Sequence, residues 1–125
     1  DAHLIAVSYN GYVLLAGQVG SPELKAQAAE EVRKIRGVRR IYNEIDVKAP
    51  TGALVRTSDA WITTKIKSWL LANMDTPGVR TKVVTENSVV YLMGLVSQEE
   101  ARRISDVAAS VSGVTRVVQL FEILP

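Results

Sequence analysis

The segment NGYVLLAGQV, residues 10–19, decides the fold because NSVVYLMGLV, residues 87–96, repeats it. In each copy a turn precedes a mostly apolar run, and Gly17 and Gly94 occupy the same position of the repeat. Apolar runs bounded by turn residues are typical of strands. Farther along, IRGVRRI at residues 35–41 matches VSGVTRV at residues 111–117, and the first copy has one extra residue near Gly20. The sequence therefore predicts two copies of one structural unit.

Each repeated strand is followed by signals for one helix. In the second copy Ser97 and Glu100 form a capping box, in which each side chain can accept from the other residue's backbone amide. In the first copy Ser21 can cap, and Pro22 suits the first helical position. We expect the helices to end at glycines in the left-handed conformation. These glycines are Gly37 and Gly113.

The remaining elements give an α+β fold with two domains. Further strands are expected at residues 4–9, 38–47, 79–85 and 114–124, with antiparallel hairpins and a last strand parallel to the second. Residues 1–49 are predicted to form a ββαβ unit without a leading helix, and residues 58–125 an αββαβ unit. Each unit is expected to be a three-stranded mixed sheet covered by helices. Residues 50–57, with a proline and a glycine, read as the linker.

Composition excludes several classes of function. The 125 residues carry a net charge of +2, too balanced for a general nucleic-acid-binding protein. The chain has no cysteine and one histidine, His3, so neither a thiolate metal site nor a cysteine nucleophile is available. Serine and threonine lack an accompanying base, and Glu99 and Glu100 are better explained as charges favoured at a helix start. We expect no enzyme, no metal and no cofactor. No apolar run approaches the ~20 residues that cross a bilayer.

The helix predicted over residues 59–74 offers the most interesting surface. At 3.6 residues per turn, one side forms a stripe suited to a core. That stripe contains Ile62, Ile66, Trp69, Leu70 and Asn73. The opposite side carries Trp61, Thr64, Ser68 and Leu71, bordered by Lys65 and Lys67. From the residues alone, two interpretations stay open: ordinary packing with a few exposed apolar residues, or a docking face.

A small basic cluster is the other feature of note. Arg36, Arg39 and Arg40 lie at the turn from the first predicted helix to the next strand. Such a cluster can contact phosphates, but a plain solvated loop explains it as well.

The repeated unit resembles the BON domain. The resemblance rests on the helix–strand–strand–helix–strand order, on Gly17 and Gly94 late in the second strand, and on the run DAWITTK at residues 59–65. The segments VTEN, YLMGLV and VSGV, beginning at residues 84, 91 and 111, are similar to dual-BON outer-membrane lipoproteins. The likeness covers essentially the whole chain and is more specific in the second copy. Residues 1–125 contain no cysteine, so the lipidated cysteine of such lipoproteins is not among them.

The resemblance implies a periplasmic protein anchored in the inner leaflet of the outer membrane. It implies binding to anionic phospholipids such as phosphatidylglycerol and cardiolipin, support of envelope integrity, and localisation to division sites. The lipid contact is expected on the first helix of the second domain. Its residues here are Trp61, Thr64, Lys65, Lys67, Ser68 and Leu71.

Two other classes of function stay open. Some dual-BON proteins are thought to be soluble periplasmic chaperones or protein-binding modules, and the uncovered sheet of the first copy offers a surface for that role. A third possibility is an oligomeric scaffold, in which the first sheet takes a helix from a neighbouring copy. Vesicle binding tests the first hypothesis, and suppression of protein aggregation tests the second.

Overall fold

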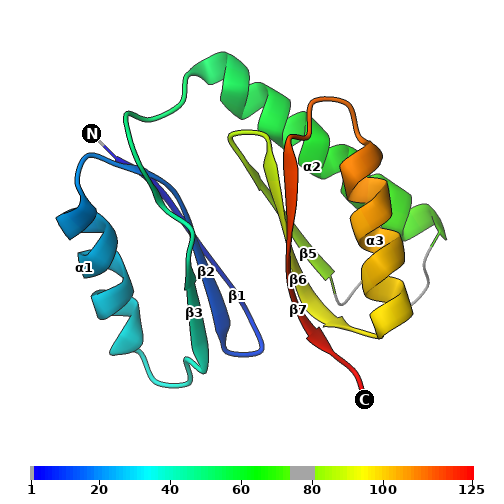
Figure 1. Cartoon of the computed structure of the whole chain (residues 1–125), viewed down its shortest axis with the longest axis horizontal. Helices are drawn as coiled ribbons and strands as arrows, with labels where there is room; N and C mark the ends of the chain where they lie inside the picture. The colour runs from blue at the N-terminus through cyan, green and yellow to red at the C-terminus, as the bar shows by residue number, and fades with distance from the viewer. Residues whose placement is uncertain (1, 74–80) are drawn as a thin grey trace. The chain divides into compact units, whose positions relative to one another are not determined.

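The computed structural model describes residues 2–73 and 81–125, which divide into two units, Asp1–Gly52 and Ala53–Pro125. Figure 1 shows a small sheet in each unit, covered by one helix in the first unit and by two in the second. The predicted α+β architecture with two repeated units is confirmed.

The first unit contains β1 (His3–Tyr9), β2 (Tyr12–Val19), α1 (Pro22–Arg33), β3 (Arg40–Asn43) and β4 (Asp46–Val47). β2 lies in the middle, antiparallel to β1 and parallel to β3 and β4. The single strand predicted over residues 38–47 is interrupted. The side chain of Asn43 accepts a hydrogen bond from the amide of Ile45 at 3.4 Å and donates one to the carbonyl of Lys25 at 2.9 Å. These side-chain bonds compete with the regular ladder and interrupt it locally.

The second unit contains α2 (Ala53–Asn73), β5 (Thr81–Glu86), β6 (Val89–Val96), α3 (Gln98–Ser110) and β7 (Arg116–Ile123). β6 is antiparallel to β5 and parallel to β7, as the sequence predicts. Part of the strand expected at residues 79–85 lies outside the described residues. The parallel register runs without a break from Val89 opposite Arg116 to Val96 opposite Ile123.

Gly17 occupies its position in the repeat for a steric reason. Its φ is +115°, in the region that side chains disfavour, and a Cβ there would collide with the carbonyl oxygen of His3 on the neighbouring strand. Gly94 also has a positive φ, of 148°. The hairpin turns repeat the same conformation, with φ of 53° at Asn10 and 50° at Asn87. The duplication therefore preserves backbone geometry as well as sequence.

The helix starts agree with the prediction and the helix ends do not. The Ser97 hydroxyl accepts from the amide of Glu100 at 3.1 Å, and the Glu100 carboxylate accepts from the amide of Ser97 at 2.7 Å. However, α1 ends at Arg33 and α3 at Ser110, so Gly37 and Gly113 do not terminate them directly. Tight turns intervene, and the glycines take φ of 93° and 97° within them.

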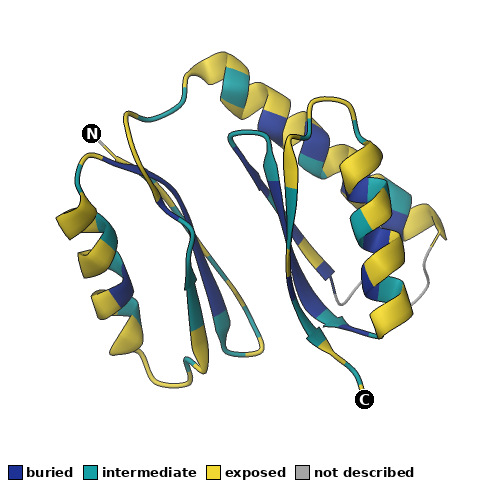
Figure 2. Cartoon of the chain, in the orientation of Figure 1, coloured by how far each residue is buried: buried dark blue, intermediate teal, exposed yellow. Residues whose placement is uncertain are grey.

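Each unit buries its own apolar core between sheet and helix (Figure 2). In the first unit the core is small, and α1 is the one helix among described residues 2–52. In the second unit both α2 and α3 contribute. The second core contains Ile62, Ile66, Leu70, Val83, Val90, Leu92, Val96, Ala101, Ile104 and Ala108.

The start of α2 corrects the linker expected at residues 50–57. The helix begins at Ala53, so residues 53–57 are helical and the non-helical connection is shorter. Pro50 and Gly52, the two residues that oppose a helix, both precede this start. Residues 53–57 contain no helix-breaking residue, so α2 starts about a turn and a half earlier than the sequence predicts.

Candidate functional site

The inward side of α2 is fixed by both packing and hydrogen bonds. Ile62 and Ile66 are fully buried, and Leu70 is nearly so. On the same stripe, Asp59 is buried, and its two carboxylate oxygens accept from the backbone amides of Asn87 at 2.8 Å and Ser88 at 2.9 Å. Charge-assisted bonds of this kind are stronger than neutral ones. They hold α2 in one rotation about its axis against the β5–β6 turn.

One residue of the predicted core stripe lies elsewhere. Asn73, at the last position of α2, is exposed, and its amide group donates to the carbonyl of Trp69 at 2.9 Å. This side chain therefore bonds back onto the last turn of its own helix and does not enter the core. Trp69 itself is half-buried and packs against the core, as its border position predicts.

The outward side of α2 presents two large apolar side chains to solvent. Trp61 is 51% exposed and Leu71 is 74% exposed. The ammonium of Lys65 lies 4.6 Å from the centre of the Trp61 ring, within the range of a cation–π contact. An indole and a cation are therefore held together on one surface. Figure 2 shows exposed residues along this side of the helix and buried ones toward the sheet.

The polar residues of this surface are also exposed. They are Thr64, Lys65, Lys67 and Ser68. The Thr64 hydroxyl donates to the carbonyl of Ala60 at 2.9 Å, so only its lone pairs are available to a ligand. Lys67 lines a small cavity of about 140 Å³ with Leu70, Leu71 and Thr81. The structure thus brings all six predicted residues onto one helix side, which we call the α2 outer surface.

Leu54 also lies on the α2 outer surface, although the sequence analysis did not predict it as a site residue. It is 88% exposed and lies seven positions before Trp61. Because seven residues make almost two full turns, the two side chains point the same way. The sequence analysis did not include Leu54 because it did not predict that residues 53–57 are helical. With Leu54 included, apolar side chains extend along most of the helix.

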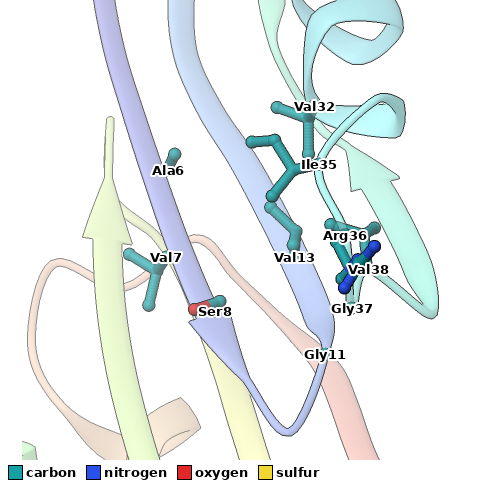
Figure 3. Close-up of a pocket in the computed structure, with 10 residues that line it drawn as sticks. All are labelled: Ala6, Val7, Ser8, Gly11, Val13, Val32, Ile35, Arg36, Gly37 and Val38. Carbon is teal, nitrogen blue, oxygen red and sulfur yellow. The ribbon is translucent and has the colours of Figure 1, made fainter.

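The first unit has an open face where the second has α2. Leu4, Ala6 and Ser8 on β1 are exposed, whereas Thr81, Val83 and Thr85 at the same repeat positions are buried. Figure 3 shows the resulting pocket between β1, β2 and the end of α1. Its volume is about 310 Å³. Ile35, which is 60% exposed, lines it beside Val13 and Val32.

The described residues hold neither a metal-binding cluster nor a membrane-spanning helix. Across residues 2–73 and 81–125, no group of three or more His, Asp or Glu side chains could hold a metal ion. No helix in the described part of the chain is long and apolar enough to span a membrane. Of the eight large apolar side chains exposed among these residues, five lie on the α2 outer surface or on the open face of the first unit.

The chain belongs to the BON domain family. The family's model matches residues 1–49 and 58–125, which correspond to the two repeated units. The fold agrees with this assignment, since each unit has the hairpin, the crossover helix and the parallel last strand.

Three bacterial proteins are similar to this chain over most of its length. The chain is 37% identical over 124 residues to the outer membrane lipoprotein DolP of Haemophilus influenzae, covering 99% of this chain and 64% of that protein. It is 39% identical over 120 residues to a 21 kDa hemolysin of Actinobacillus pleuropneumoniae, covering 96% and 62%. It is 32% identical over 108 residues to the osmotically-inducible protein Y of Escherichia coli, covering 84% and 54%. The chain thus spans somewhat under two thirds of the length of these relatives.

Proposed function

We propose that this chain is a dual-BON protein of the bacterial envelope that binds anionic phospholipid through the α2 outer surface. The proposed ligands are phosphatidylglycerol and cardiolipin, and the proposed location is the periplasm, at the inner leaflet of the outer membrane. The proposed cellular role is support of outer-membrane integrity, with localisation at division sites. The name of the Haemophilus influenzae relative, an outer membrane lipoprotein, supports the location.

The observation that carries the proposal is the joint exposure of Trp61, Leu71 and Leu54 beside two lysines. An indole is suited to the membrane interface, because its ring is apolar and its N–H needs a polar partner. Leucine side chains gain about 25 cal/mol for each Å² removed from water. A helix that only covered its own core has no need of these three side chains on the far side.

Charge supplies the preference for anionic lipid. Lys65 and Lys67 can lay their stems along the apolar surface and keep their ammonium groups at the headgroup phosphates. Each basic residue near an anionic leaflet is worth about 1 kcal/mol. The buried carboxylate of Asp59 is turned away toward the sheet, so it does not oppose this attraction from the outer side. The sum is a weak, reversible contact, effective alongside a second attachment.

Co-sedimentation with lipid vesicles tests the proposal. Vesicles containing phosphatidylglycerol should pull down the chain, and pure phosphatidylcholine vesicles should not. Leu71→Glu should abolish binding, because it places a negative charge at the leaflet. Val47→Glu is the matched control, since Val47 is also an exposed apolar residue, 44% exposed, but lies in the first unit. Equal binding by Leu71→Glu and the wild type would remove α2 from the proposal.

A second candidate function is protein binding, and the open face of the first unit favours it. A cavity of about 310 Å³ beside the exposed Ile35 can accept an apolar side chain of another polypeptide. On this hypothesis the chain suppresses aggregation of unfolded proteins in the periplasm. Ile35→Lys should then abolish the suppression and leave vesicle binding intact. An unchanged suppression in that variant would exclude this face.

A further inference from the structure

The arginines at the start of β3 are held in place by aromatic rings. The guanidinium of Arg39 lies 5.0 Å from the centre of the Tyr12 ring, and that of Arg40 lies 4.9 Å from the centre of the Tyr42 ring. The two rings are themselves 6.1 Å apart and tilted by 59°. Arg39 also donates from Nη1 to the carbonyl of Asn10 at 3.2 Å. Two flexible cations are thus ordered by contacts within the first unit.

A stacked guanidinium can still donate hydrogen bonds from its edge, as Arg39 does to the carbonyl of Asn10. The ring covers one flat side, whereas the N–H groups lie in the plane and point outward. These edges match the oxygen atoms of a phosphate, which arginine can bind with two parallel hydrogen bonds. Because the stacked side chains are already ordered, less conformational entropy is lost on binding.

A cavity lies beside these arginines. Its volume is about 180 Å³, and it is lined by Arg33, Val38, Arg39, Arg40 and Ile41. A site of this size has room for several waters, and therefore for a phosphate group with part of its hydration. We call it the arginine cavity. It lies at β3, whereas the open face of the first unit involves β1.

The local charge favours an anion. Residues 33–40 contain five basic residues and no acidic one. Glu30 and Glu31 offset two of them, through ion pairs of 2.8 Å to Arg33 and 2.9 Å to Lys34. The carbonyl end of α1 adds only about half a negative charge. The balance around the arginine cavity stays clearly positive.

The second unit lacks this arrangement at the same repeat positions. There Ala109 replaces Arg33, Thr115 replaces Arg39, and Val89 and Val118 replace the two tyrosines. Of the three cavity arginines, Arg40 alone has a basic counterpart, Arg116. The second unit forms the same fold with uncharged residues in place of Arg33, Arg39 and the two tyrosines, so the repeated fold itself does not require a basic or aromatic side chain at those four positions. We propose that the arginine cavity is a phosphate-binding site of the first unit, separate from the α2 outer surface.

An NMR titration of the full chain tests the proposal. Inorganic phosphate is added at constant ionic strength, and the Nε–H signals of the arginine side chains are followed. We expect saturable shifts at Arg33, Arg39 and Arg40. The double variant Arg33→Ala, Arg39→Thr takes the residues of the second unit and should bind about tenfold more weakly or not at all. The control Arg102→Ala, Arg103→Ala removes the same charge from α3 and should bind normally.

A second arm distinguishes free phosphate from a lipid headgroup. Short-chain phosphatidic acid, kept below its micelle concentration, carries the same phosphate on a lipid. Shifts at the cavity with this lipid alone identify a headgroup site, and shifts with inorganic phosphate identify a site for soluble phosphate. Absence of saturable shifts with both probes, or equal binding by Arg33→Ala, Arg39→Thr, overturns the proposal. Trp61→Ala should leave cavity binding unchanged, so this result is independent of vesicle binding by α2.

Discussion

Replacing Trp61 by alanine gives the most quantitative prediction about membrane binding. A tryptophan side chain can bury about 250 Å². Because Trp61 is 51% exposed, roughly half of that area, about 125 Å², is available to a membrane. At about 25 cal/mol per Å², complete transfer from water gives about 3 kcal/mol. Alanine recovers little of this, and an interfacial ring is only partly transferred. We therefore expect a loss of about 1.5–3 kcal/mol, or about 10- to 150-fold in partition coefficient.

The assay is a titration with phosphatidylglycerol vesicles, read by sedimentation so that loss of the indole does not affect the signal. Leu24→Ala is the matched control, because Leu24 is 46% exposed but lies on α1 in the first unit. Thermal unfolding should show both variants folded, since neither Trp61 nor Leu24 belongs to the apolar core of its unit. A partition coefficient for Trp61→Ala within twofold of the wild type would refute the reasoning from exposed area.

Three further predictions concern stability and charge. Asp59→Ala should lower the free energy of unfolding by about 2–4 kcal/mol, because it removes two charge-assisted bonds at a buried position. The control Asp106→Ala, on the exposed side of α3, should change the free energy of unfolding little in the same urea titration. A loss below 1 kcal/mol, about the value of one ordinary hydrogen bond, would contradict that role. Ser97→Ala should cost about 1 kcal/mol in urea unfolding, because it breaks the capping box of α3, and an unchanged midpoint would show the cap to be dispensable. Vesicle binding should weaken as sodium chloride rises, and Lys65→Gln with Lys67→Gln should flatten this dependence; a dependence as steep as that of the wild type would mean that other cations carry the attraction.

The sequence repeat made the fold predictable, and the features that were not predicted depend on tertiary contacts. Gly17 and Gly94 marked equivalent strands because both need a backbone conformation that side chains disfavour. Ser97 and Glu100 marked a helix start because capping is local chemistry. The interruption between β3 and β4 was not predictable in this way. It depends on the contact of Asn43 with the carbonyl of Lys25, eighteen residues away.

The position of the candidate site on α2 was predicted from local sequence periodicity. The periodicity of Ile62, Ile66 and Leu70 fixed the inward side, and so it fixed the outward side with Trp61. Leu54 was missed because helix propensity alone does not settle where a helix begins. Asp59 was missed because its partners, two amides in a distant turn, become neighbours only after folding. A polar residue on a core stripe is the signal that could have revealed it, since buried carboxylates need hydrogen-bond donors.

The central claim, that the α2 outer surface meets the lipid, is tested most directly by spin-labelled phosphatidylglycerol in anionic micelles. The label broadens the NMR signals of nearby protons. We expect broadening to be strongest at Leu54, Trp61 and Leu71 and weak at Ile62 and Ile66 on the opposite side of the helix. Broadening concentrated on β1 or on the arginine cavity, with α2 spared, would contradict the account.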